Sequence, residues 1–136
     1  MTLSLALQQK GFNVIIVDPK SVKDLISTDK RTTAVAEGPK NFYDSLGVWE
    51  KVKKYAEPIK IINIKDGNSK IDLNFNCNTF KEIKNINNLG HVIENSHLLR
   101  GINTTIKNNK NIGSIKRIKA KVVSIDSDNF SSKKKN

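Results

Sequence analysis

The alternation of apolar and polar residues at the start of the chain predicts a helix followed by a buried strand. Residues 2–10, "TLSLALQQK", place their apolar positions on one side of a helix. Gly11 follows the predicted helix end, where glycine adopts the left-handed cap at no steric cost. The β-branched run 14–17, "VIIV", is typical of a parallel strand covered on both faces, and Asp18-Pro19 ends it.

Farther along, the pattern predicts several short elements. We expect a short helix over 21–26, a strand in "TTAVA", two short helices on either side of Gly47, a strand at 91–93, a helix over 96–107 and one or two strands in "IKRIKAKVVSID". Residues 58–75 read as a β-hairpin, with Asp66-Gly67 supplying a positive φ between its strands. This order predicts an α/β layer with an added antiparallel piece.

Composition limits where the protein works. The 136-residue chain has no run of about 18 apolar residues and no basic segment ahead of its first apolar stretch, which argues against a membrane span and a secretory signal. Its single cysteine, Cys77, excludes an intrachain disulfide and fits a reducing compartment. We therefore expect a cytoplasmic protein. No metal-ligand spacing surrounds Cys77, so we expect a half-buried strand thiol and no metal site.

The net charge of +11 raises the question of nucleic-acid binding, which we do not expect. The chain holds 21 Lys but 3 Arg, beside 17 Asn and 17 Ile, a bias that an AT-rich coding sequence produces. Arginine is the better residue for bidentate recognition of phosphates and bases, and it is scarce here. The lysines are scattered except for the run at 133–135, so solvated surface explains most of them.

Asp18 is the first candidate for binding chemistry. A dinucleotide-binding βαβ unit ends its second strand with an acidic residue that binds ribose hydroxyls, but an ordinary Asp-Pro turn also explains Asp18. Counting back from Gly11, Val14 and Asp18, the third glycine of the phosphate-binding loop falls immediately before Met1. We therefore expect the first strand and the Gly-rich loop to be missing.

Two further segments carry polar candidates. Arg31 follows a polar loop and precedes a short strand, where it could hold a phosphate or ribose, or form an exposed ion pair with Asp29. Asn95 and Ser96 fall at a strand-to-helix junction, where either is a good N-cap. His91 and His97 have no partner at metal or triad spacing, so both read as structural or exposed.

Three blocks in this order and at these separations carry a family resemblance: "GFNVIIVDP", "KRTTAVAEGPKNFYDSLGVWE" and "LGHVIENSHLLRGI". Together they resemble the N-terminal third of FAD-dependent aromatic-ring monooxygenases, specifically the ubiquinone-biosynthesis hydroxylases. The "LGVWE" and "GHVIEN" blocks are more specific than the dinucleotide-binding remnant. The similarity covers residues 1–126, and residues 127–136 are expected to form a frayed basic tail.

The resemblance implies a partial FAD-binding domain of Rossmann type that includes the hairpin. It assigns Asp18 to the adenosine ribose of FAD, Arg31 to a position along the cofactor, and Asn95 to the flavin side, with Arg100 as a weaker candidate. It also implies NAD(P)H as reductant, O2 as co-substrate and a polyprenyl phenol as the ring substrate. The family also implies contact with the surface of the inner membrane and membership of a ubiquinone-biosynthesis complex. No residue of this sequence indicates either one.

The departures from the family are equally informative. The Gly-rich loop, the later Gly-Asp flavin motif and most of the substrate sheet are absent, so we expect a truncated, split or late-started reading frame. Such a chain should bind FAD weakly at best and be inactive alone. Two alternatives stay open: a non-catalytic module completed by a second chain, and a small basic nucleic-acid-binding protein.

Overall fold

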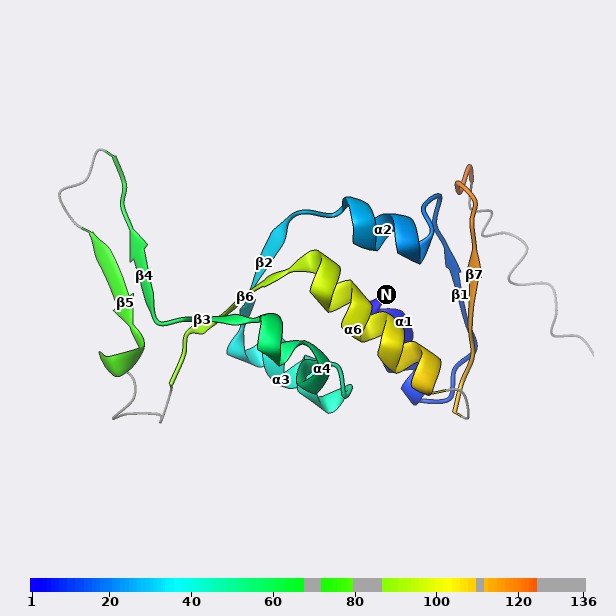
Figure 1. Cartoon of the computed structure of the whole chain (residues 1–136), viewed down its shortest axis with the longest axis horizontal. Coiled ribbons are helices and arrows are strands. Elements are labelled where there is room, and N and C mark those ends of the chain that lie inside the picture. The colour runs from blue at the N-terminus through cyan, green and yellow to red at the C-terminus, as the bar shows by residue number, and fades with distance from the viewer. Residues whose placement is uncertain (68–71, 80–86, 110–111, 125–136) are drawn as a thin grey trace, which may run out of the picture.

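A computed structural model describes residues 1–67, 72–79, 87–109 and 112–124. Within these ranges the chain folds into a mixed α/β arrangement with a two-stranded parallel sheet, a three-stranded antiparallel sheet and a separate hairpin (Figure 1). The expected α/β class is therefore confirmed at this coarse level. The hairpin extends from one end of the molecule, and the parallel pair lies at the other (Figure 1).

The parallel pair brings together two strands that lie near opposite ends of the described chain. Helix α1 (Thr2–Gln9) is followed by Gly11, whose φ of 86° makes the predicted left-handed turn, and then by β1 (Val14–Val17). Strand β1 runs parallel to β7 (Ile115–Ile118) in register from Val14 opposite Ile115. Helix α2 (Val22–Thr28) follows β1 in the sequence. It begins with a capping box, in which the side chains of Ser21 and Asp24 each accept a hydrogen bond from the backbone N–H of the other.

The expected cover on both faces of β1 is wrong for the described part of the chain. Ile15 and Val17, on the outer face, are 64% and 40% exposed, whereas Val14 and Ile16 are half-buried beneath the helices. A β-branched run therefore formed a parallel strand as its propensity predicts, but only one face has something to pack on.

The antiparallel sheet has β6 (Gly90–Glu94) at its centre, between β2 (Thr32–Ala36) and β3 (Glu57–Ile59). Helix α3 (Glu37–Ser45) follows β2, and α6 (Asn95–Asn108) follows β6. Helix α4 (Trp49–Val52) and a 3-10 turn at Lys53–Tyr55 precede β3. The strands at "TTAVA" and 91–93 and the helix over 96–107 are confirmed to within two residues.

The core lies where this sheet meets α1, α4 and α6. Its buried apolar members are Leu5, Val35, Leu46, Val48, Trp49, Val52, Ile93, Leu98 and Ile102. Gly101 allows α6 to lie close to α4, because a Cβ at that position would overlap Cγ1 of Val52. No residue of β1 or β7 is among these core residues.

The predicted hairpin exists, but with different bounds. Strands β4 (Ile61–Ile64) and β5 (Leu73–Asn76) pair antiparallel, whereas Glu57–Ile59 joins β6 instead. Of the residues between these strands, the structure describes 65–67 and 72, and Gly67 does not adopt a positive φ. The tight Asp66-Gly67 turn is therefore wrong, because the strands stop short of it.

Cys77 is a free, buried thiol directly after β5 rather than a half-buried strand residue. The frayed tail at 127–136 lies outside the described residues. In the part of the chain that the structure covers, no helix has the length and apolar character needed to cross a membrane.

Candidate functional site

The structure brings Arg31 and Asn95 together around one carboxylate, that of Asp29. Arg31 donates from Nε to Asp29 Oδ1 at 2.9 Å and from Nη2 to Oδ2 at 2.8 Å. Asn95 donates from Nδ2 to the same Oδ2 at 3.2 Å, across 66 positions of sequence. The exposed ion pair between Arg31 and Asp29, one of the two alternatives for Arg31, is therefore confirmed.

The antiparallel pairing of β2 and β6 produces this meeting. Thr32 lies opposite Glu94, so the residues just beyond each strand end emerge side by side. The backbone N–H of Asn95 donates to the carbonyl of Arg31 at 2.9 Å, and the hydroxyl of Thr33 donates to Oδ1 of Asn95. Because strand pairing and side-chain bonds agree, the cluster Asp29–Arg31–Thr33–Asn95 is held from both segments.

This geometry corrects the N-cap prediction. Helix α6 starts at Asn95 with Glu94 as its N-cap residue and no side-chain cap. Asn95 turns its amide toward Asp29 and Thr33, and Ser96 donates its hydroxyl to the carboxylate of Glu94 at 3.3 Å. The side chain of Asn95 thus serves the cluster rather than the helix end.

Electrostatics favour an ionised Asp29. Hydrogen bonds from the Arg31 guanidinium, followed by one from Asn95, hold the pKa of the Asp29 carboxyl well below its usual range, against an opposing effect of burial. The carboxylate is 14% exposed and Arg31 is 81% exposed. A guanidinium has five N–H donors, so Arg31 keeps solvent-facing donors for an anionic ligand while Asp29 orients it.

A cavity of about 250 Å³ adjoins the cluster. Asp29, Thr33 and Asn95 line one part of it, and Met1 and Thr2 at the start of α1 line another. The first turn of α1 has no acidic side chain and no side-chain cap, so its free N–H groups give this part of the cavity a partial positive charge. The cavity therefore combines amide donors with the carboxylate of Asp29, and Arg31, which does not line it, is bonded to that carboxylate.

Asp18 lies at a different place, at the end of β1. Its Oδ1 accepts from the backbone N–H of Lys20 at 2.7 Å, which is the turn geometry predicted as one alternative. It lines a cavity of about 180 Å³ together with Arg117. Both Asp18 and Arg117 act on the amino group of Met1, whose pKa is lowered chiefly by burial, then by Arg117, while Asp18 opposes the change.

Arg117 is a residue that the sequence analysis did not single out. Its Nη1 and Nη2 atoms are buried and have no hydrogen-bond partner among the described residues. The alternation of β7 could have identified it, because Arg117 shares the inward face with Ile115 while Lys116 and Ile118 are exposed.

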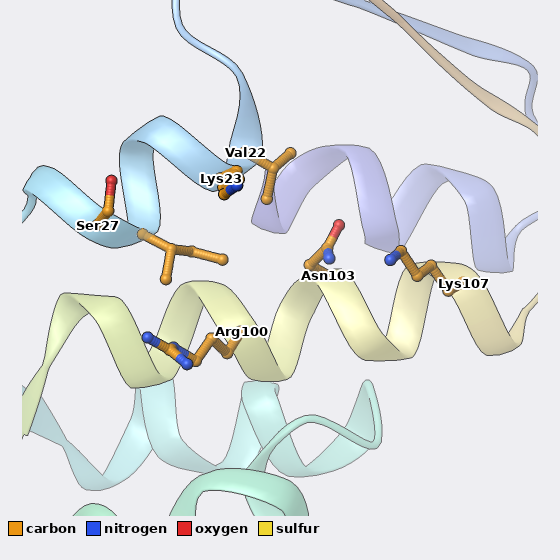
Figure 2. A pocket seen from close by; sticks show the side chains of 7 residues that line it. Val22, Lys23, Ser27, Arg100, Asn103 and Lys107 are labelled. Carbon is orange, nitrogen blue, oxygen red and sulfur yellow. The ribbon is translucent and has the colours of Figure 1, made fainter.

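Arg100 does not join the Asp29 cluster. It lies on α6 five residues after Asn95, on another face of the helix, and lines a separate cavity of about 650 Å³ between α2 and α6 (Figure 2). The four sequence-predicted residues thus divide into Arg31 with Asn95, Asp18 with Arg117, and Arg100 alone.

The two histidines make ring contacts. His91 meets Trp49 edge-on at 5.1 Å between ring centroids, and His97 stacks on Tyr55 at 3.9 Å. Within the described ranges, no group of His, Cys, Asp and Glu side chains could hold a metal ion.

The similarity to the ubiquinone-biosynthesis hydroxylases, which the sequence blocks indicate, is confirmed by comparison with curated proteins. The chain is a distant homologue of a Rhodospirillum rubrum protein named Ubiquinone hydroxylase UbiL, with 27% identity over 107 residues. The matched region is 77% of this chain but 24% of that relative, so the chain spans about a quarter of its length. No family model matches the chain.

Proposed function

We propose that this chain contributes part of the cofactor site of a flavin-dependent monooxygenase that hydroxylates a polyprenyl-phenol ring in ubiquinone biosynthesis. The observation that carries the proposal is the meeting of "DKRTTAVA" and "VIENS" at Asp29, since the family resemblance assigns both segments to FAD. The similarity to a ubiquinone hydroxylase supports the same assignment. The parallel β1–β7 pair is consistent with part of a Rossmann-type sheet.

The donors at the cluster fit a dinucleotide only in part. Arg31 and the amide groups at the start of α1 would hold a phosphate or ribose oxygen, and Asn95 would present its amide close by. A cavity of about 250 Å³ is smaller than the roughly 300–1,000 Å³ typical of small-molecule sites. The described residues would therefore hold a portion of FAD, with weak affinity.

When bound, FAD would accept reducing equivalents from NAD(P)H and activate O2 for transfer of one oxygen atom to the ring. This chain's own residues would orient the cofactor. Asp29 would fix the guanidinium of Arg31, and Thr33 would fix the amide of Asn95, so that neither side chain must be ordered when the ligand arrives. We expect the isolated chain to bind without catalysing.

FAD titration followed by flavin fluorescence tests the binding proposal. Arg31→Ala should weaken FAD binding about tenfold or more, because a charge-assisted hydrogen bond contributes about 1.5–3 kcal/mol. Lys30→Ala is the matched control, since Lys30 is an exposed neighbouring cation without a partner in the described part of the chain. Equal affinities of the Arg31 and Lys30 variants, or no flavin binding at millimolar FAD, would contradict the proposal. NADH- or NADPH-dependent O2 uptake by the chain alone would contradict its inactivity.

The exposed outer face of β1 favours one second candidate, a non-catalytic module completed by another chain. Ile15 on β1 and Ile118 on β7 are apolar and exposed on that face, and the described residues provide nothing to cover them. Affinity purification should then recover a partner that carries the Gly-Asp flavin motif absent from this sequence. Recovery of the chain as a monomer without such a partner would exclude this candidate.

A further inference from the structure

The groove between α2 and α6 is chemically unlike the cluster at Asp29. Figure 2 shows the lining residues Val22, Lys23 and Ser27 on α2 and Arg100, Asn103 and Lys107 on α6. Its volume of about 650 Å³ lies within the range of small-molecule sites. We propose that this groove binds an organic phosphate of nucleotide size, and the proposal does not depend on the flavin site.

All the charged side chains that line the groove are positive. Lys23, Arg100 and Lys107 line it, and no carboxylate does. In the part of the chain that the structure covers, none of these three cations forms an ion pair. Three positive charges along one groove, without a carboxylate among its lining residues, favour a ligand with several negative charges.

The nearby carboxylates are engaged elsewhere. Asp24, on α2, accepts from the backbone of Ser21 and lies 3.7 Å from Lys119. Asp29, after the end of α2, is held by Arg31. Neither acid lines the groove, so the positive charge of its walls is not neutralised by the helix that forms one of them.

Helix periodicity explains why these cations share a groove. Arg100, Asn103 and Lys107 follow at intervals of three and four residues, so they occupy one side of α6. The opposite side carries Leu98 and Ile102 into the core. Because the opposite face of α6 packs into the core, the helix holds Arg100, Asn103 and Lys107 on the side that lines the groove.

The groove also has neutral features that suit an organic ligand. Val22 and Ile26 supply an aliphatic surface from α2, against which a base or another flat group could pack. The amide of Asn103 has no partner among the described residues and offers both a donor and an acceptor. Charge for phosphate, aliphatic surface and a free amide together favour an organic phosphate over a bare inorganic anion.

Calorimetric titration of the full chain with ADP, pyrophosphate and adenosine tests the proposal. We expect ADP to bind more tightly than pyrophosphate, and adenosine to bind weakest. The Lys23→Gln/Lys107→Gln double variant should lose affinity for ADP about tenfold or more, because two charged contacts are removed. The control double variant Lys60→Gln/Lys116→Gln removes the same charge from exposed positions outside the groove and should stay within twofold.

The location of ADP separates this proposal from the flavin proposal. Amide NMR shifts on ADP binding should centre on Ser27 and Asn103, and these shifts should persist in Arg31→Ala. A loss of ADP binding in Arg31→Ala but not in the Lys23/Lys107 variant would overturn the groove proposal and leave the flavin site standing. Equal binding of pyrophosphate and ADP, equal losses in both double variants, or tighter binding of an RNA oligonucleotide at the same residues would also overturn it.

Discussion

The parallel pair β1–β7 and the antiparallel sheet β2–β6–β3 bury their apolar residues to different extents. Ile93 on β6 is 1% exposed because helices cover its face of the sheet, whereas Ile15 on β1 is 64% exposed. Strand sequence sets the tendency to form a strand, but the neighbouring elements determine how much apolar surface is buried. The covered face of the antiparallel sheet therefore contributes Val35 and Ile93 to the core, whereas the parallel pair contributes no buried residue.

The largest expected effect separates these two regions directly. Ile93→Ala should lower the free energy of unfolding by about 3 kcal/mol, because it removes buried methylene and methyl groups and leaves a cavity. Ile15→Ala is the matched variant in the parallel pair and should change that free energy by less than about 0.5 kcal/mol. Urea denaturation measures both. Equal losses would show that Ile15 is covered in solution.

A smaller effect of opposite sign is expected inside the parallel pair. Arg117→Met should raise the free energy of unfolding by about 1 kcal/mol, because it removes a guanidinium whose terminal nitrogens are buried without a partner in the described residues. Lys116→Met, on the exposed face of the same strand, should stay within about 0.5 kcal/mol of the parent. Thermal unfolding at fixed pH measures the pair. A loss of stability in the Arg117 variant would show that the guanidinium has a partner.

The smallest effect concerns the end of the antiparallel sheet, where Asp29 accepts hydrogen bonds from Arg31, just before β2, and from Asn95, just after β6. Because the pKa of Asp29 is lowered in the folded state, the unfolded chain binds more protons between the two pKa values, and stability rises with pH in that window. The contribution of the carboxylate is present above the ordinary aspartate pKa of about 3.9 and is lost as pH falls through the lowered value.

Urea midpoints of the parent and Asp29→Asn measured against pH test this sign. The difference between them should be constant near neutral pH and should shrink in the acid range. A difference that persists unchanged down to pH 2 would contradict the role of ionisation, and the Asp44→Asn variant, whose side chain is exposed on α3, controls for net charge.

Local signals predicted the elements of this fold better than the contacts between them. Gly11 after an amphipathic helix and the "VIIV" run predicted α1 and β1, because helix caps and strand propensity act over a few residues. The Asp66-Gly67 turn failed because strand ends depend on pairing, and β3 pairs with β6 rather than continuing the hairpin. Pro58, which lies within β3, gave no sign of that change of partner.

In the candidate site, too, contacts between residues close in the sequence could be predicted and long-range contacts could not. The ion pair between Asp29 and Arg31 could be predicted, since the residues are two positions apart. The contact of Asn95 with Asp29 could not, because it depends on the register of β2 against β6. The α2–α6 groove likewise needs two helices to pack side by side, so the sequence did not predict it, and Arg100 was proposed only for FAD, on the family resemblance.

The pairing of β1 with β7 has a consequence for the order of folding. Asn13 and Ser114, which bond side chain to side chain at 2.7 Å beside these strands, are 101 positions apart. Closing so long a loop costs conformational entropy, which is offset only by contacts that form afterwards. This pairing should therefore form late, after the local contacts of α3 with α4 and of β4 with β5. During synthesis, β1 therefore leaves the ribosome long before its partner strand exists.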